Sequence, residues 1–324
     1  MKVIAACLGV FLLSALAAGE DPELRATAIA LLERANAVST PASAPPYEAF
    51  ITFRFFSPGE GTKDGQRTIV WLGPKESRAE VTFGDYHLVN VITPHHLSAT
   101  NEGDTPMPAA VWQLNKLQPI HLVRFDHEDV INSISGSQVR GRPAQCIEFD
   151  TRFGSTVQNN EVCVDKENGT LLRFRNANVV TENTEFFPYG GAYWPGRIDY
   201  FRNGVQVLEI HTQLKVLEGT PDPNVLLPPP GSVFLERCRQ YRPPFARQVF
   251  QPGAGQGGET FDLVVTGVVD ENGRLRLPTV ELSDRPDLQQ EALQTAAKWV
   301  FTPAMCDGKP TAREASIVLN FIGR

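Results

Sequence analysis

Four cysteines are the residues of this sequence whose spacing most directly indicates chemistry. A fifth cysteine, Cys7, lies in an apolar N-terminal stretch, and the other four are Cys146, Cys163, Cys238 and Cys306. Thiols become paired in oxidising compartments, so an even number of cysteines in an exported chain predicts two disulfides. Four cysteines allow three pairings, and their number alone does not select one.

A hairpin would favour one of these pairings. Cys146 and Cys163 lie on either side of Asp150–Asn160, where a hairpin would bring them together. Cys238 and Cys306 would then pair, joining a linker to the turn after the last helix. Loop closure would contribute about 3 kcal/mol for the short bridge and about 4 kcal/mol for the long one.

Metal or hydrolase chemistry is the alternative for the polar residues. The sequence has no Cys-x-x-Cys pair and no histidine at ligand spacing from the four cysteines, which argues against zinc. Adjacent His95 and His96 on a strand would point to opposite faces, and Asp126–Asp129 is typical of a solvated turn or a helix start. Gly-x-Ser-x-Gly, His-Glu-x-x-His and a phosphate-cradling glycine loop are absent. We therefore expect no catalytic, cofactor-binding or metal-binding residues.

Composition limits the class of protein. A chain of 324 residues favours two domains, and 42% apolar residues suffice for ordinary cores. A formal net charge of −7 argues against a nucleic-acid partner, because phosphate binding needs a basic surface. The chain has 19 phenylalanines and several Asn-Gly pairs, which predict β-rich structure with hairpins.

Residues 1–18 are predicted to be a signal peptide. Lys2 gives a positive start, Val3–Leu16 is apolar, and small residues allow cleavage near Ala17/Ala18. The alternative is an uncleaved membrane anchor, but the apolar stretch is shorter than the roughly 20 residues that span a bilayer. Cys7 lies too early in this stretch to be a lipidation site.

Residues 19–219 predict a domain made mostly of strands. An amphipathic helix over Asp21–Val38 is followed by strands from Tyr47 to Leu217, with a second helix over Thr105–Leu117. We therefore expect an α+β fold in which a curved antiparallel sheet forms a half-barrel with two covering helices. Such a sheet can enclose an apolar ligand cavity, lined here by the aromatic residues Phe53, Phe55, Trp71 and Trp112.

Several short motifs between Tyr47 and Glu218 have the spacing of a known family. They are Tyr47–Phe56, Gly84-Asp85-Tyr86, Gly141–Cys146, Cys163–Leu172 and Tyr193–Ile198. With these motifs the region resembles the LolA/RseB-like half-barrels, which are periplasmic carriers of lipoproteins and lipids. The resemblance implies a periplasmic location and an apolar ligand or acyl lipid as the binding partner.

Residues 220–258 predict a linker, because their many prolines cannot join the interior of a sheet. Four arginines make the segment locally basic, namely Arg237, Arg239, Arg242 and Arg247. This charge suits a solvated linker, and it also suits a site for an acidic partner or a lipid headgroup. Gly253–Gly258 is expected to be a flexible tether.

Residues 259–324 predict a small domain made of a hairpin, a helix and a final strand. The first strand leads into Asp270–Gly273, where Asn272 and Gly273 would both need positive φ. The helix would start at Asp284 and end at Pro303, and its apolar face would contain Leu288, Ala292, Ala296 and Trp299.

This small domain resembles the TonB C-terminal domain family. The resemblance covers Glu259–Phe321, and the motifs that carry it are Val269–Arg274, Glu291-Ala292-Leu293, Lys298–Ala304 and Asp307–Pro310. Domains of that family reach outer-membrane transporters by pairing a strand with an extended segment of the partner. The resemblance therefore implies an envelope protein as partner.

The sequence as a whole predicts a non-enzymatic cell-envelope binding protein. The N-terminal half-barrel would bind the apolar ligand or acyl lipid, and the C-terminal domain would bind a protein by strand addition. The alternative is a TonB-like adaptor or energy transducer for outer-membrane transport, retained in the membrane by its N-terminal segment. The short Pro-rich linker weighs against that alternative, which needs a long spacer.

Overall fold

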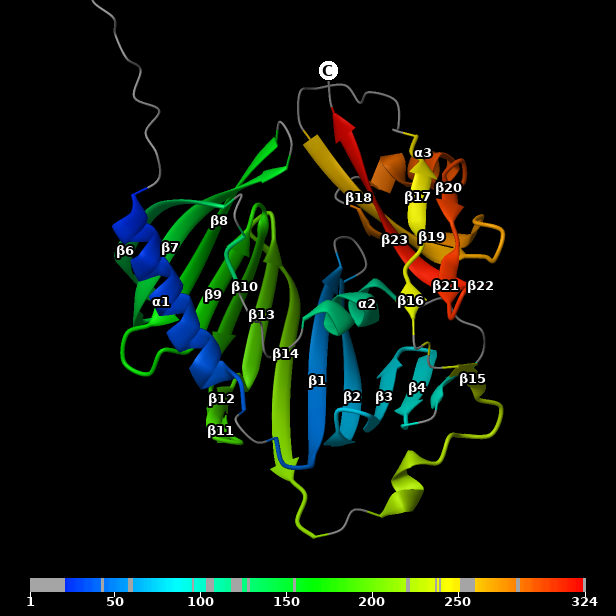
Figure 1. Ribbon diagram of the computed structural model, residues 1–324, viewed down its shortest axis with the longest axis horizontal. Helices are drawn as coiled ribbons and strands as arrows, with labels where there is room; N and C mark the ends of the chain where they lie inside the picture. Colours follow the sequence, from blue (N-terminus) through cyan, green and yellow to red (C-terminus); the bar gives the residue numbers. More distant parts are fainter. Residues whose placement is uncertain are drawn as a thin grey trace, which may run out of the picture. The chain divides into compact units, whose positions relative to one another are not determined.

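The computed structural model describes residues 21–41, 44–57, 61–94, 96–102, 108–117, 124–126, 129–153, 156–219, 222–236, 238, 240–250, 260–283 and 286–322. Most of them form antiparallel strands and few form helices, which is consistent with the predicted α+β class (Figure 1). The predicted signal peptide, His95, His127 and the glycine-rich tether lie outside these ranges. Within these ranges, no helix is both long and apolar enough to cross a membrane.

The chain forms two compact units, each assembled from two stretches of sequence. Residues 1–40 and 121–182 form the first unit, and residues 41–120 and 183–324 form the second. The strands of the first unit lie in the order β10-β9-β8-β7-β6. Their bounds are β6 (Val130–Val139), β7 (Arg142–Phe153), β8 (Thr156–Asp165), β9 (Leu171–Asn176) and β10 (Val179–Thr184).

Helix α1 (Pro22–Ser39) covers one face of the first unit's strands (Figure 1). Its predicted start is confirmed, because the Asp21 carboxylate accepts a 2.9 Å hydrogen bond from the Glu23 backbone N–H. One stripe of the helix packs on the sheet and shares a core with it, formed by Ala28, Leu32, Ala35, Ile131, Ile147, Phe149, Val162, Val164 and Leu171. Burial of this stripe, more than helix propensity, keeps the helix in place.

The turn that leads into β6 is built around Asp129, which is only 5% exposed. Its carboxylate accepts hydrogen bonds from the Thr151 hydroxyl at 2.6 Å and the Asp126 backbone N–H at 2.7 Å. Arg25 of α1 donates to the backbone oxygens of Asp126 and Asp129. The prediction of a solvated turn is therefore wrong for Asp129, because the turn is a docking point for α1.

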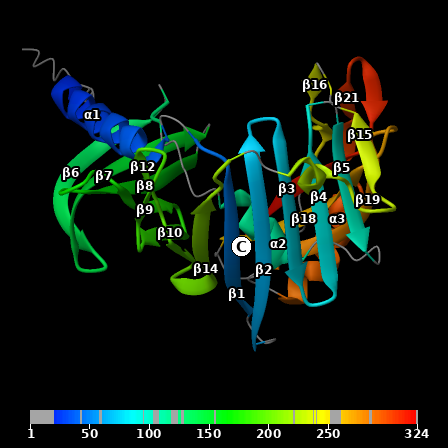
Figure 2. The same ribbon diagram turned by 90° about the horizontal axis from the view of Figure 1, so that it is seen from below.

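The main sheet of the second unit has the strand order β15-β5-β4-β3-β2-β1-β14-β13. Strands β1 to β4 lie side by side in Figure 2. The bounds are β1 (Tyr47–Ser57), β2 (Gly61–Gly73), β3 (Glu76–Phe83), β4 (Tyr86–Ile92), β5 (His96–Glu102), β13 (Arg197–Arg202), β14 (Val205–Val216) and β15 (Val233–Glu236). The smaller elements are α2 (Ala109–Lys116), β11 (Phe187–Tyr189), β12 (Ala192–Trp194) and η1 (Pro223–Leu226).

The C-terminal part of the second unit is a three-stranded sheet, in the order β19-β18-β23, with a helix packed on it. Its elements are β18 (Thr260–Val269), β19 (Leu275–Ser283), η2 (Pro286–Leu288), α3 (Gln289–Ala296), β20 (Val300–Thr302), β21 (Ala304–Cys306), β22 (Lys309–Thr311) and β23 (Arg313–Ile322). The core between helix and sheet contains Leu263, Val265, Val269, Ala292, Ala296, Phe301, Ile317 and Leu319.

The segment expected to be a linker contains strands of its own. Strand β15 pairs with β5, β16 (Tyr241–Arg242) pairs with β21, and β17 (Phe245–Gln248) pairs with β20. The prolines of the segment lie outside these three strands, as the lack of a proline N–H requires. Residues 241–248 are therefore part of the C-terminal fold.

Helix α3 is shorter than the sequence predicted, because it ends at Ala296 and leaves Trp299 outside it. Val300–Thr302 forms strand β20, in which Phe301 is paired with Ala246 and donates its backbone N–H to the Gly273 oxygen at 3.0 Å. Both partners lie far from the helix in sequence, so local periodicity could not show them. The predicted start, Asp284, lies outside the described ranges.

Two Asn-Gly turns differ in backbone conformation. Asn203 and Gly204 have φ of 51° and 74°, as a two-residue hairpin turn requires. In Asp270–Gly273 only Gly273 has positive φ, and the Asp270 carboxylate instead accepts the backbone N–H groups of Asn272 and Arg274. The prediction of positive φ for Asn272 is therefore wrong, because the aspartate closes a longer turn.

Gly273 offers a test of the close packing at this turn. A Cβ at Gly273 would lie 2.0 Å from the Phe301 oxygen, whereas a Cβ at Gly308 would meet nothing within 4 Å, and both residues have positive φ. We expect Gly308→Ala to cost about 1 kcal/mol of unfolding free energy and Gly273→Ala about 3 kcal/mol. Urea denaturation of both variants measures the difference, and equal losses would contradict the packing argument.

Candidate functional site

One face of the second unit's main sheet is apolar and aromatic. In the pairing of β1 with its neighbours, Tyr47 is opposite Trp71, Phe53 is opposite Ile210, and Phe55 is opposite Leu208. Because alternate residues of a strand point to opposite faces, Phe53, Phe55 and Trp71 share one face. Trp112, the fourth residue predicted to line a cavity, belongs to α2, and its side chain lies outside the described part of the structure.

Three phenylalanines cluster on this face. Phe53 is buried, with its ring stacked on Phe83 at a centroid distance of 5.6 Å, and Phe55 meets Phe83 edge-on at 6.3 Å. Phe53 lies over Gly65 on β2, where a Cβ would come within 2.2 Å of the ring. A glycine opposite Phe53 therefore allows the large ring to lie flat against the sheet.

A second aromatic cluster lies on the same face and consists of Tyr47, Trp71, Tyr189 and Trp194; we call it the Tyr–Trp cluster. Trp71 stacks on Tyr47 at 5.5 Å, and Tyr189 meets Tyr47 edge-on at 5.3 Å. The Tyr189 hydroxyl donates to the Pro45 backbone oxygen at 2.7 Å. Burial raises the pKa of Tyr189 to about 12, and the nearby Tyr47 phenol adds to this increase.

Arg67 adds a cation to the apolar face. Its cross-strand partners are Ile51 and Val81, so the Arg67 side chain leaves the sheet between two aliphatic residues. Its Nη1 donates to Asn115 Oδ1 of α2 at 3.1 Å. Burial lowers the pKa of Arg67, and Tyr47 opposes that decrease. Among the described residues, no carboxylate forms an ion pair with Arg67.

The opposite face of the same strands is polar and carries a cavity of about 490 Å³. Seven of its ten lining residues lie at strand positions that alternate with those of the apolar face, so they belong to the polar face. They are Thr52, Arg54, Asp64, Gln66, Thr82, Glu209 and His211. Phe53 also lines this cavity. An apolar cavity bounded by Phe53, Phe55, Trp71 and Trp112 together stays a prediction.

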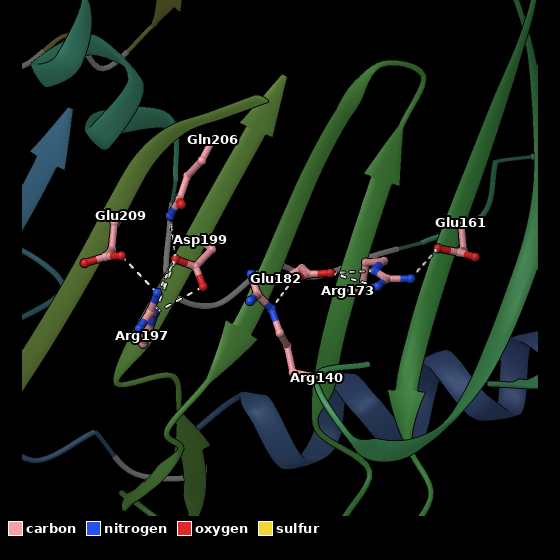
Figure 3. A network of polar contacts seen from close by, with 8 residues as sticks. All are labelled: Arg140, Glu161, Arg173, Glu182, Arg197, Asp199, Gln206 and Glu209. Atoms are coloured by element: carbon pink, nitrogen blue, oxygen red, sulfur yellow. Dashed lines mark hydrogen bonds and ion pairs between the residues drawn. The ribbon is translucent and has the colours of Figure 1, made fainter. Parts of the chain in front are cut away.

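A buried carboxylate, Asp199, organises one ionic network beside this cavity (Figure 3). Arg197 donates to both carboxylate oxygens at 3.0–3.2 Å, and Gln206 donates to one of them at 2.9 Å. Arg197 also bonds Glu209 at 2.9 Å, and His211 lies 3.0 Å from the other oxygen of Glu209. Burial would raise the pKa of Glu209, but His211 and Arg197 outweigh burial and lower it.

A second network, in the first unit, is centred on Glu182 (Figure 3). This carboxylate is only 7% exposed and accepts hydrogen bonds from Arg140 at 2.6 Å and from two nitrogens of Arg173 at 2.8 and 3.0 Å. Arg173 also lies 3.6 Å from Glu161. The network lies on the face of the sheet opposite α1. There the two arginines compensate the charge of the buried Glu182 carboxylate, which would be costly to bury unpaired.

The structure contains two disulfides, Cys146–Cys163 and Cys238–Cys306. These are the two pairs that the hairpin argument favoured, and Cys146 and Cys163 are direct cross-strand partners on β7 and β8. Within the described ranges, Cys146, Glu161 and Cys163 also form the single group close enough to hold a metal ion. Both sulfurs are in the disulfide, so the site as it stands offers one ligand.

The three described histidines do not converge on one place. His87 pairs with Glu80 at 3.0 Å, His96 lies 3.2 Å from the Thr93 hydroxyl, and His211 pairs with Glu209. The pairs of His87 and His211 lie within or between neighbouring strands of the main sheet, and Thr93 lies in the turn between β4 and β5. Among the residues that the structure describes, these contacts give no histidine cluster of the kind a hydrolase needs.

The C-terminal sheet has two edge strands, β19 and β23. Strand β23 pairs with β18 along its whole length, from Arg313 opposite Val269 to Ile322 opposite Thr260. In the described part of the chain, no strand pairs with the outer side of β23. An edge of this length presents a row of backbone donors and acceptors to an extended partner.

Sequence reasoning missed Arg67 and the Asp199 network. A signal existed for both, since Arg67 alternates along its strand with the same spacing as Ile69 and Trp71 and therefore shares their face. Arg197 and Asp199 are two residues apart and so share a face. Their partner Glu209 comes from the next strand, and only the register could place it.

Comparison with known families and structures identifies the C-terminal part. Residues 254–322 match the family described as Gram-negative bacterial TonB protein C-terminal, which confirms the resemblance predicted for Glu259–Phe321. No curated protein matches the chain.

Solved structures similar to this chain include members of the LolA-like family that the sequence resembles, and their TM-scores are low. A LolA superfamily protein from Nitrosomonas europaea is 13% identical with a TM-score of 0.36, covering 60% of this chain and 96% of its own. A DUF1329 family protein from Desulfovibrio piger is 11% identical with a TM-score of 0.40, covering 62% and 96%. The Pseudomonas aeruginosa MucA/MucB complex is 12% identical with a TM-score of 0.27, covering 77% and 82%.

The Tyr–Trp cluster gives a pH-dependent test. Because the pKa of Tyr189 is raised from 10.0 to about 12, its contribution to stability is complete below pH 10 and is lost as the pH rises toward 12. The loss should be about 2–3 kcal/mol of unfolding free energy. Tyr189→Phe should cost about 1 kcal/mol at neutral pH, through the lost hydrogen bond to Pro45, and should lose less stability at alkaline pH.

Urea denaturation of the wild type and the variant over this pH range measures the two slopes. Tyr193→Phe is the matched control, because Tyr193 is 39% exposed and its replacement should leave the wild-type slope unchanged. Equal slopes for the wild type and Tyr189→Phe would contradict the assignment.

Proposed function

We propose that this protein is a non-enzymatic binding protein of the cell envelope. Its main sheet binds an apolar ligand or acyl lipid, and its C-terminal domain binds an envelope protein by strand addition. The observation that carries the first part is the apolar face of β1, β2, β3 and β14, with its two aromatic clusters and Arg67. The observation that carries the second part is the match of residues 254–322 to the TonB C-terminal family.

The aromatic face suits an acyl chain. Phe55 and Trp71 are partly exposed and lie at two places along the face, so a chain could contact both aromatic clusters. Each methylene removed from water contributes about 0.8 kcal/mol. A chain of ordinary length would therefore bind without any hydrogen bond along its length.

Arg67 suits the polar end of such a ligand. One of its nitrogens donates a hydrogen bond to the Asn115 side chain, and a guanidinium group has further N–H donors. A carboxylate or phosphate beside it would form a charge-assisted pair in a partly desolvated place. Helix α2 carries Asn115, so ligand binding at Arg67 would act on the position of that helix.

The proposed organisation follows the sequence boundaries. A signal segment over residues 1–18 directs export, residues 19–219 carry the ligand face, and residues 259–324 carry the TonB-like interaction domain. The two disulfides suit an exported protein and support a periplasmic location. Strand β23 is the edge proposed for the partner's extended segment.

Phe55 provides the test of the ligand face. Native mass spectrometry of protein purified from the cell envelope should show a bound acyl lipid that organic extraction removes. Phe55→Asp places a carboxylate on the apolar face and should lower the bound fraction at least about tenfold. Val205→Asp is the control, because Val205 is 60% exposed at a turn and its change should leave lipid binding intact.

Two outcomes would overturn this assignment. One is a wild-type protein that carries no lipid and acquires none from added fatty acid or phospholipid. The other is equal lipid binding by the wild type and Phe55→Asp, with both folded as judged by circular dichroism.

A further inference from the structure

Residues 241–250 expose an unusual set of side chains, and we call this segment the arginine–aromatic arm. Phe245 is 72% exposed, and Tyr241, Val249 and Phe250 are each roughly half exposed. Single exposed apolar residues are common, but several within ten residues indicate a surface that binds something. The proposed function leaves this surface unexplained.

Charge distinguishes the arm from the rest of the protein. The formal net charge of the chain is −7, yet residues 237–258 contain four arginines and no aspartate or glutamate. Within the described part of that stretch, Arg242 and Arg247 are both exposed. The arm is therefore a cationic, aromatic strip on an acidic protein, and its complement is an anionic surface.

The arm is held firmly to the C-terminal fold. Cys238 is disulfide-bonded to Cys306, and Gln240 exchanges hydrogen bonds with Asp307 at 2.8 and 3.0 Å. Strands β16 and β17 then run beside β21 and β20 (Figure 1). At the far end, Trp299 Nε1 donates to the Phe250 backbone oxygen at 2.8 Å.

This attachment fixes which residues face outward. Ala246 packs against the C-terminal core, whereas its neighbours Phe245 and Arg247 are exposed. Because the arm is already ordered by these contacts, its aromatic side chains are presented without a large cost of ordering on binding.

Backbone chemistry favours a lipid surface over an extended acidic peptide as the occupant. Strand addition needs a continuous row of N–H and C=O groups, whereas Pro243 and Pro244 interrupt the arm between β16 and β17 and lack N–H groups. Strand β17 has only four residues. A lipid surface needs no register, and it accepts aromatic rings at the headgroup level and arginines beside the phosphates.

We propose that the arginine–aromatic arm docks this protein on an anionic lipid surface. Phe245, Tyr241 and Phe250 enter the headgroup region, and Arg242 and Arg247 pair with lipid phosphates. This site is distinct from the proposed ligand face. The arm would contact the headgroups of lipids that stay in the membrane, whereas the ligand face would hold a single bound lipid.

The test is co-flotation of the full-length protein with vesicles of phosphatidylethanolamine and phosphatidylglycerol, against vesicles of phosphatidylcholine alone. We expect binding to the anionic vesicles and much weaker binding to the neutral ones, with a loss of binding as salt is raised. The double variant Arg242→Glu and Arg247→Glu should weaken binding to anionic vesicles at least about 30-fold, since each arginine near such a surface contributes about fivefold.

A matched control carries the same change of charge elsewhere. Lys75→Glu with Lys215→Glu alters two exposed lysines outside the arm and should keep most of the binding. Phe245→Ser, which retains both arginines, should weaken binding to anionic vesicles about tenfold. All variants should keep the Cys238–Cys306 disulfide, which non-reducing peptide mapping verifies.

Three results would overturn the proposal. They are equal binding to neutral and anionic vesicles, equal loss in the arm and control variants, and capture of an acidic peptide by the arm without vesicle binding. Phe55→Asp separates this proposal from the ligand face, because it should lower the lipid bound in native mass spectra and leave vesicle flotation unchanged.

Discussion

The alternation of side chains between the two faces of an antiparallel sheet is the constraint on which this molecule depends. In β1, Phe53 and Phe55 face one way and Arg54 faces the other, and pairing with β2 and β14 extends each pattern across the sheet. A register shift of one residue would bring charged groups to the apolar face and aromatic rings to the polar face. The aromatic clusters and the Asp199 network therefore both depend on one register.

The ionic networks show what the polar face needs in order to be stable. Asp199 is 1% exposed, so its charge is removed from water and must be compensated within the sheet. Two nitrogens of Arg197 and the amide of Gln206 supply that compensation, and Glu209 engages the remaining part of Arg197. Such a network fixes the relative position of β13 and β14, because a shift of either strand would leave a buried carboxylate unpaired. The ionic network on the polar face thus helps to fix the strand register on which the apolar face depends.

Local features were predictable from the sequence, and most non-local ones were not, the two disulfide pairs being the exception. The start of α1 follows from Asp21 and Pro22, and the turn at Asn203-Gly204 follows from its two residues, because both depend only on neighbours in the chain. The end of α3 depends on Phe301 pairing with Ala246 and on its bond to Gly273, and the burial of Asp129 depends on Arg25 and Thr151. For the candidate site, alternation placed Phe53, Phe55 and Trp71 on one face. It could not reveal Arg67 beside Asn115, since that contact joins two elements.

The expected linker bears on the choice between a binding protein and an energy transducer. Only residues 237–240 separate β15, which pairs with the main sheet, from β16, which pairs with the C-terminal fold. Four extended residues span about 14 Å at most, and Cys238 within them is tied to Cys306. A transducer that crosses the periplasm needs a long, free spacer, whereas this proline-rich segment contains three strands that pair with other strands of the second unit. Residues 241–248 are thus a structural part of the C-terminal fold, and this attachment favours the binding role over that of a transducer.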